Sequence, residues 1–102
     1  MLTREHKRTI QSRIQRDPKF ARALYAEAIN ALLEGETAVG LSALRDLVEA
    51  CITFEELSHQ TGFGEKALHR MLSRRGKPPT RTLVTVIRAV QQDLNIVPRV
   101  TV

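Results

Sequence analysis

Regular breaks between short amphipathic segments are the feature that most constrains the fold of this chain. Within each segment apolar residues recur every three or four positions, which is the spacing of one face of an α-helix. The breaks fall at residues that cap or end helices, namely Asp17-Pro18, Gly35, Thr53, Gly62 and the run from Gly76 to Thr80. We therefore expect an all-α protein, a compact bundle of about five to six helices.

The same breaks place the expected helices along the chain. The first covers about residues 4–15, and the second starts after an Asp17 N-cap with Pro18 at its first position and ends at Gly35. Thr80 is expected to cap the last helix. The buried faces of the later helices are predicted to comprise Leu41, Leu44, Leu47, Val48, Phe54, Leu57, Leu68, Met71, Leu72, Leu83, Val86, Ile87, Val90 and Leu94.

A length of 102 residues fits one domain. We divide it into an N-terminal helical extension (1–36), a core with a helix-turn-helix (37–95) and a tail (96–102). The tail is rich in β-branched residues but contains Pro98. Two interpretations stay open for it, a strand paired across a dimer or a frayed end.

Composition argues against several functional classes. No apolar run approaches the roughly 20 residues that a membrane helix needs, and no apolar segment follows the charged start as in a secretory signal. Cys51 is the only cysteine, so no internal disulfide can form, and we expect a cytoplasmic protein with this residue buried as a small hydrophobe. The three histidines and Cys51 lack zinc-like spacing, and no nucleophile or phosphate loop is apparent. We expect no metal, no cofactor and no catalysis.

Charge is distributed unevenly along the chain. Residues 1–26 hold seven Lys or Arg and two acids, residues 27–65 hold one Arg and eight acids, and residues 66–92 hold seven Lys or Arg and no acid. An unopposed basic stretch is typical of proteins that bind an anionic polymer such as nucleic acid. A solvated basic surface is the alternative interpretation.

The segment from about residue 53 to residue 72 predicts a helix-turn-helix. Thr53 and Glu56 have the spacing of a capping box, in which each side chain bonds the other residue's backbone N–H. Gly62 allows a sharp turn through a positive φ, and Ser58 is small enough for the helices to approach closely there. In such a pair the second helix enters the major groove of DNA.

The outward residues of the second helix and of the loop after it are the candidate DNA contacts. Early positions of that helix would reach base edges, and the cations beyond it would reach phosphates. Glu65 could instead complement the helix dipole. The candidates are Glu65, Lys66 and His69 for bases, and Thr53, Arg70, Arg74, Arg75 and Lys77 for phosphates.

Residues 37–95 resemble the XRE or lambda-repressor-like helix-turn-helix family. The matching elements are Leu57-Ser58, Gly62-Phe63-Gly64, Leu68 and the Gly76-Lys77-Pro78-Pro79 loop before Leu83 and Ile87. The chain departs from the family at Ser58, Gly64 and Leu72, where Ala, a Ser or Thr cap, and Glu are usual. The resemblance implies specific binding to double-stranded DNA. Because one such helix reads few base pairs, we expect a homodimer on a near-palindromic operator.

A narrower resemblance, to HigA-like addiction module antidote proteins, covers almost the whole chain. It rests on Arg16-Asp17-Pro18-x-Phe20, Ala28-Ile29, Leu32-Leu33-Glu34-Gly35, Leu44-Arg45-Asp46-Leu47-Val48, Phe54-Glu55-Glu56-Leu57 and Lys66-x-Leu68-x-Arg70-Met71-Leu72. The resemblance implies a type II antitoxin that represses its own operon and neutralises a cognate toxin of the RelE/HigB type. Two alternatives remain open, a stand-alone XRE-type repressor and a protein-interaction module that has lost DNA binding.

An acidic segment offers a physical counterpart to a basic toxin, since complementary charge speeds association. A solvated acidic face is the alternative interpretation of each residue. The candidate toxin contacts are Glu27, Glu34, Glu36, Asp46 and Glu49.

Overall fold

The computed structural model describes residues 4–102, which form six α-helices and one π-helical segment and contain no strand. The predicted all-α bundle is confirmed. In chain order the elements are α1 (Arg4–Arg16), α2 (Pro18–Leu33), α3 (Thr37–Leu47), the π-helical η1 (Val48–Ile52), α4 (Phe54–Thr61), α5 (Glu65–Met71) and α6 (Thr80–Leu94).

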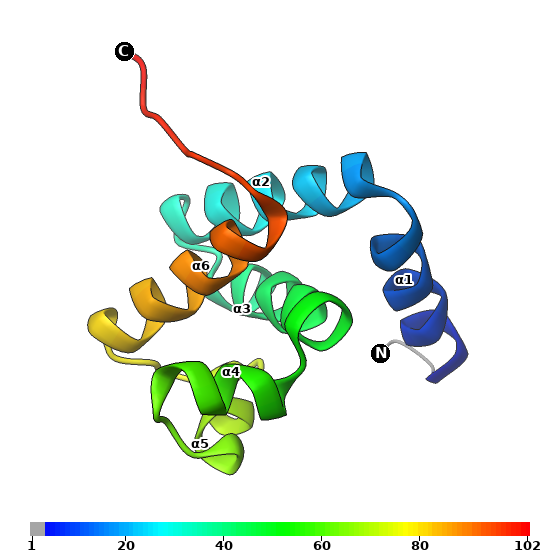
Figure 1. Cartoon of the computed structure of the whole chain (residues 1–102). Helices are drawn as coiled ribbons and strands as arrows, with labels where there is room; N and C mark the ends of the chain where they lie inside the picture. Colours follow the sequence, from blue (N-terminus) through cyan, green and yellow to red (C-terminus); the bar gives the residue numbers. More distant parts are fainter. Residues whose placement is uncertain (1–3) are drawn as a thin grey trace.

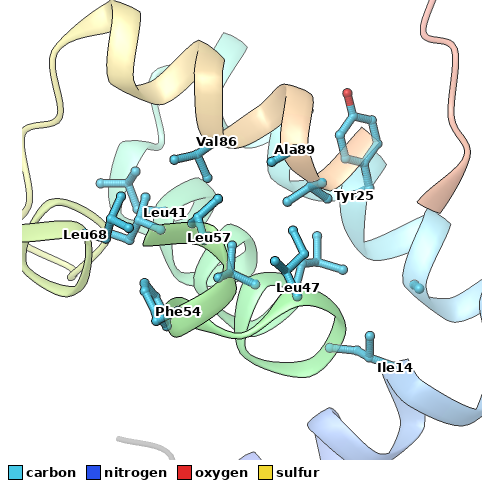
Figure 2. Packing of buried hydrophobic residues seen from close by; sticks show 14 residues of the cluster. Ile14, Tyr25, Leu41, Leu47, Phe54, Leu57, Leu68, Val86 and Ala89 are labelled. Atoms are coloured by element: carbon cyan, nitrogen blue, oxygen red, sulfur yellow. The ribbon is translucent and has the colours of Figure 1, made fainter. Parts of the chain in front are cut away.

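Helix α3 lies in the middle of the bundle. Helix α2 packs along it, α6 crosses nearby, and α4 and α5 lie together at the end of the molecule remote from the α1–α2 corner (Figure 1). Leu41, Leu44 and Leu47 of α3 are completely buried. Figure 2 shows side chains from α1 to α6 converging on one core around Leu47 and Leu57. This core fixes the position of the α4–α5 pair.

The predicted start and end of α2 are confirmed. The Asp17 carboxylate accepts hydrogen bonds from the backbone N–H groups of Lys19 and Phe20, at 3.1 and 3.3 Å, and Pro18 is the first helical residue. Gly35 follows the helix at φ +83°, the left-handed conformation that ends many helices.

Two kinds of local prediction need correction, the cap of the last helix and the burial of several apolar residues. Pro79 rather than Thr80 is the N-cap of α6: Pro79 is extended and its carbonyl accepts from Leu83 N–H, so Thr80 is already helical. Five residues that were expected inside the core are half-buried at its edge, namely Cys51, Met71, Leu83, Ile87 and Leu94. Helical spacing identifies the side that faces inward but does not show how deeply each position is covered.

The N-terminal helices are tied to the core by long-range hydrogen bonds. Gln11 Nε2 donates to Glu49 Oε2 at 2.6 Å, which joins α1 to η1, and Glu49 Oε1 also lies 3.3 Å from Arg45 Nε. Gln91 Nε2 of α6 donates to the hydroxyl of buried Tyr25 on α2 at 2.6 Å. These helices therefore belong to the same packed body as α4 and α5.

The tail after α6 has no helix or strand and leads away from the body (Figure 1). Val97, Val100 and Val102 of this tail are exposed. Pairing of the tail across a dimer stays a prediction. In the part of the chain that the structure describes, no helix is long and apolar enough to cross a membrane.

Candidate nucleic-acid interface

Helices α4 and α5 are joined by a three-residue turn, Gly62 to Gly64. Gly62 adopts φ +80°, and its N–H donates to the carbonyl of Ser58 at 2.9 Å. No atom lies within 4 Å of the position a Cβ would take there, so the requirement for glycine is conformational and not steric. The positive φ predicted from the sequence is confirmed.

Two hydroxyl groups of α4 hold this turn. Ser58 Oγ donates to the carbonyl oxygen of Phe63 at 2.6 Å. Thr61 Oγ1 donates to the Leu57 carbonyl at 2.7 Å and accepts from Phe63 N–H at 3.3 Å. The sequence predicted only that Ser58 had to be small. The hydroxyl of Ser58 therefore has a second role that an alanine could not take, because it ties α4 to the far side of the turn.

Thr53 caps α4, but the predicted capping box is only half right. Thr53 Oγ1 accepts from the Glu56 N–H at 3.2 Å, as expected. The reciprocal bond is wrong, because Thr53 N–H donates to the Val48 carbonyl at 2.7 Å and so has no need of the Glu56 carboxylate. Thr53 also adopts φ +82°, ψ 149°, which is a costly conformation for a β-branched residue. Thr53 holds this conformation at the C-terminal end of η1, where its N–H bonds the Val48 carbonyl.

Substitutions at Thr53 separate the cap from the strain. Thr53→Ala removes the hydroxyl and keeps a Cβ at positive φ, so we expect the free energy of unfolding to fall by about 1 kcal/mol. Thr53→Gly also loses the hydroxyl but relieves the backbone, and it should match the parent to within about 0.5 kcal/mol or exceed it. Urea unfolding followed by circular dichroism measures both variants. A glycine variant less stable than the alanine variant would show that the positive φ of residue 53 does not strain the backbone.

Helix α5 exposes two stripes of polar side chains. Lys66 and Arg70 are four residues apart, are both exposed and share one face. Glu65 and His69 share a second face, where Glu65 is exposed but His69 is half-buried. The His69 ring stacks on Phe54 of α4, with centroids 3.8 Å apart and planes 21° apart. The sequence predicts His69 only as an outward residue, and no pattern in it indicates this contact.

The loop after α5 carries three further exposed cations, Arg74, Arg75 and Lys77. Gly76 lies between them against the end of α5: a Cβ there would overlap the Met71 carbonyl oxygen and lie 2.6 Å from the Met71 carbonyl carbon. Glycine is therefore needed for a close approach of backbone to backbone. The loop therefore packs closely against the C-terminal end of α5, so its cations lie near that helix.

We call Lys66, Arg70, Arg74, Arg75 and Lys77 the cationic surface. All five are exposed, and none forms an ion pair with a residue between 4 and 102. The sequence has no acid from Lys66 to Gln92. Thr53, the remaining phosphate candidate, is exposed at the start of α4. The positive charge of this surface is therefore available to an anion.

Four of the five acidic toxin-contact candidates share a second surface, which meets the cationic surface at Arg74. Glu27, Glu34, Glu36 and Asp46 line a cavity between α2 and α3 with a volume of about 810 Å³. Burial, reinforced by the nearby Glu49 carboxylate, raises the pKa of Asp46 above its ordinary value. Glu49 does not line this cavity, because it is bonded to Gln11 and Arg45 as described above.

Residues 4–102 contain no cluster of three or more His, Cys, Asp or Glu side chains that could hold a metal. Cys51 is half-buried, and burial, followed by the charge of Asp93, raises the pKa of its thiol. A raised pKa disfavours the reactive thiolate at neutral pH.

This chain matches a known protein family. A family model described as "Probable addiction module antidote protein" matches residues 16–98. The chain belongs to this family. The antidote family model extends from the end of α1 past α6, so it includes the α4–α5 pair, the loop cations and the α2 and α3 residues that line the cavity. Membership places the chain in the antitoxin class and implies a cognate toxin as partner. Searches of curated proteins and of solved structures gave no match.

Proposed function

We propose that this antidote protein binds double-stranded DNA through α5 and the cationic surface, represses its own operon and neutralises a toxin of the RelE/HigB type. The observation that carries the DNA-binding part is the set of five exposed, unpaired cations on a short helix and the loop that follows it. Phosphate contacts supply most of the affinity of such proteins for duplex DNA. The proposal requires no catalysis and no cofactor.

Lys66 is the strongest candidate for reading a base. It lies in the first turn of α5 on the fully exposed stripe, and a lysine can donate to the acceptors of guanine in the major groove. The His69 ring is packed on Phe54 and so helps to fix the angle between α4 and α5. Only the edge of this ring is then left to contact DNA. Glu65 remains a candidate acceptor for a cytosine amino group.

A homodimer supports the required affinity and specificity. A single α5 covers only a few base pairs, whereas two copies related by a twofold axis read two half-sites about one helical turn apart. The operator is therefore expected to be near-palindromic. Repression of the protein's own operon places its action where the DNA is, in the cytoplasm.

Substitution of Lys66 tests base reading. We expect Lys66→Ala to lower the preference for the duplex upstream of the protein's own gene over a scrambled duplex by roughly 5- to 150-fold, since a good base contact contributes about 1–3 kcal/mol of discrimination. Lys77→Ala is the matched control, because loss of a phosphate contact should weaken binding to both duplexes by the same factor. Fluorescence anisotropy measures both affinities. Unchanged preference in the Lys66 variant would remove Lys66 from the base contacts.

Family membership favours the antitoxin over a stand-alone repressor. The toxin part of the proposal is tested by co-expressing the chain with the product of the adjacent reading frame. Co-purification of a small basic protein whose expression alone stops growth is the expected result. Failure of every neighbouring product to bind would contradict a toxin partner while leaving the DNA-binding proposal intact.

A further inference from the structure

The cavity between α2 and α3 combines an apolar floor with an acidic rim. Its floor includes the buried Ala31 and Ala43, and one wall is Val39, which is 58% exposed. Val39 leaves an apolar side chain open to solvent beside a hollow of about 810 Å³, and the half-buried Leu24 and Ala38 line the same hollow. The cavity therefore offers apolar area that no segment of residues 4–102 covers.

The rim carries negative charge that residues 4–102 leave unpaired. Glu27 lies on α2, Glu34 directly follows the end of α2 and Glu36 directly precedes α3, and all three are exposed. None of them forms an ion pair with a described residue. Arg45, which also lines the cavity, forms an ion pair with Glu49 at 3.3 Å. Lys7 and Arg74 are the other lining cations, so the α2 and α3 walls remain acidic in balance.

We propose that this cavity is the docking groove for an amphipathic helix of the cognate toxin, with apolar side chains facing Val39 and the floor and with Lys or Arg facing Glu27, Glu34 and Glu36. This rests on the proposed function, because it names where and how the toxin binds. A hollow between two helices accepts a third helix by its apolar face, and complementary charge sets its orientation and speeds its arrival.

The charge of the rim argues against a second copy of this chain as the occupant. A twofold dimer places the same patch of each subunit against the other. At this groove that symmetry would bring Glu27, Glu34 and Glu36 toward their own counterparts, and like charges brought together disfavour association. A basic partner has no such penalty.

Two groove variants and two matched controls test the inference. The groove variants are Val39→Asp and the double charge reversal Glu27→Lys/Glu34→Lys, all at positions exposed enough to leave folding intact. The controls are Val84→Asp, an exposed valine of α6, and Glu5→Lys/Glu55→Lys, two exposed acids; none of these positions lines the cavity. The probe is the purified product of the adjacent reading frame, with its dissociation constant measured by calorimetry.

We expect each groove variant to weaken the toxin complex about tenfold or more and each control to change it less than about threefold. Binding to the upstream duplex, measured in parallel, should stay within about threefold for both groove variants. Groove variants that bind the toxin as tightly as the parent would overturn the groove and leave the antitoxin function standing. A parent that binds no neighbouring product would overturn both. Analytical ultracentrifugation of the free protein tests a second copy of this chain as the occupant. A parent that is dimeric and groove variants that are monomeric would show that a second copy fills the groove.

Discussion

Reversing the charges of Arg74 and Arg75 together is expected to weaken duplex binding about 100-fold or more, because two charge-assisted contacts worth about 1.5–3 kcal/mol each are lost. Both side chains are exposed on the loop after α5 and neither is paired within residues 4–102, so their charges are not already used by the fold. The variant Arg74→Glu/Arg75→Glu should therefore fold as the parent does. Its loss of affinity should be the same for the upstream duplex and for a scrambled one.

The matched control is a reversal of two cations at the opposite corner of the molecule. Arg16 and Lys19 are exposed at the α1–α2 corner, far from α5 in the bundle (Figure 1). Arg16→Glu/Lys19→Glu changes the net charge by the same amount as the loop variant. We expect this control to lower affinity less than about fivefold, through long-range electrostatics alone. Equal losses in the two double variants would mean that net charge, and not the cationic surface, governs binding.

Gly76→Ala is expected to lower the free energy of unfolding by about 2–3 kcal/mol or more, which is the cost of forcing extra volume into a packed site. The new methyl group would overlap the Met71 carbonyl oxygen and lie 2.9 Å from the Arg70 carbonyl oxygen. Both atoms belong to the backbone of α5, so neither can rotate away as a side chain would. For a chain of this length the melting temperature should fall by about 10–20 °C.

Gly64→Ala is the control for this experiment. Gly64 lies at φ −63°, ψ 143°, an ordinary extended conformation, and no atom lies within 4 Å of its Cβ position. Its stability should stay within about 0.5 kcal/mol of the parent. Thermal unfolding by circular dichroism compares the two variants. A Gly76 variant as stable as the Gly64 variant would show that the loop does not pass so closely to the end of α5.

The parts of the fold that the sequence predicts are those set by local rules. Asp17-Pro18 and Gly35 define the ends of α2 through their own backbone preferences, and Gly62 predicts the turn between α4 and α5 in the same way. The inward residues of α3 follow from helical spacing, since every third or fourth position meets the same neighbour. These features need no knowledge of distant residues.

The features that the sequence did not reveal depend on contacts between elements. The π-helical η1 makes the Val48 carbonyl available to Thr53 N–H, and no local pattern predicts such a segment. The stack of His69 on Phe54 requires the actual angle between α4 and α5. Helical spacing along α5 therefore predicted a more exposed His69 side chain than the structure has.

The acidic candidates also show that sequence spacing does not determine which residues share a surface. Charge patterning grouped Glu27, Glu34, Glu36, Asp46 and Glu49 in one stretch, but packing divides them. Four line the cavity, whereas Glu49 joins α1 to η1 through Gln11. Glu49 is separated from the other four because α1 packs against η1. This contact joins segments that are far apart in the sequence, so spacing within α3 does not predict it.

The salt dependence of DNA binding tests the central claim most directly. Four charged phosphate candidates, Arg70, Arg74, Arg75 and Lys77, predict that log K for the upstream duplex falls against log salt with a slope of about −3.6 per bound chain, at about 0.9 for each phosphate neutralised. Fluorescence anisotropy between low and physiological salt gives this slope. A slope near zero, or no duplex binding at low salt, would contradict the assignment of this surface to nucleic acid.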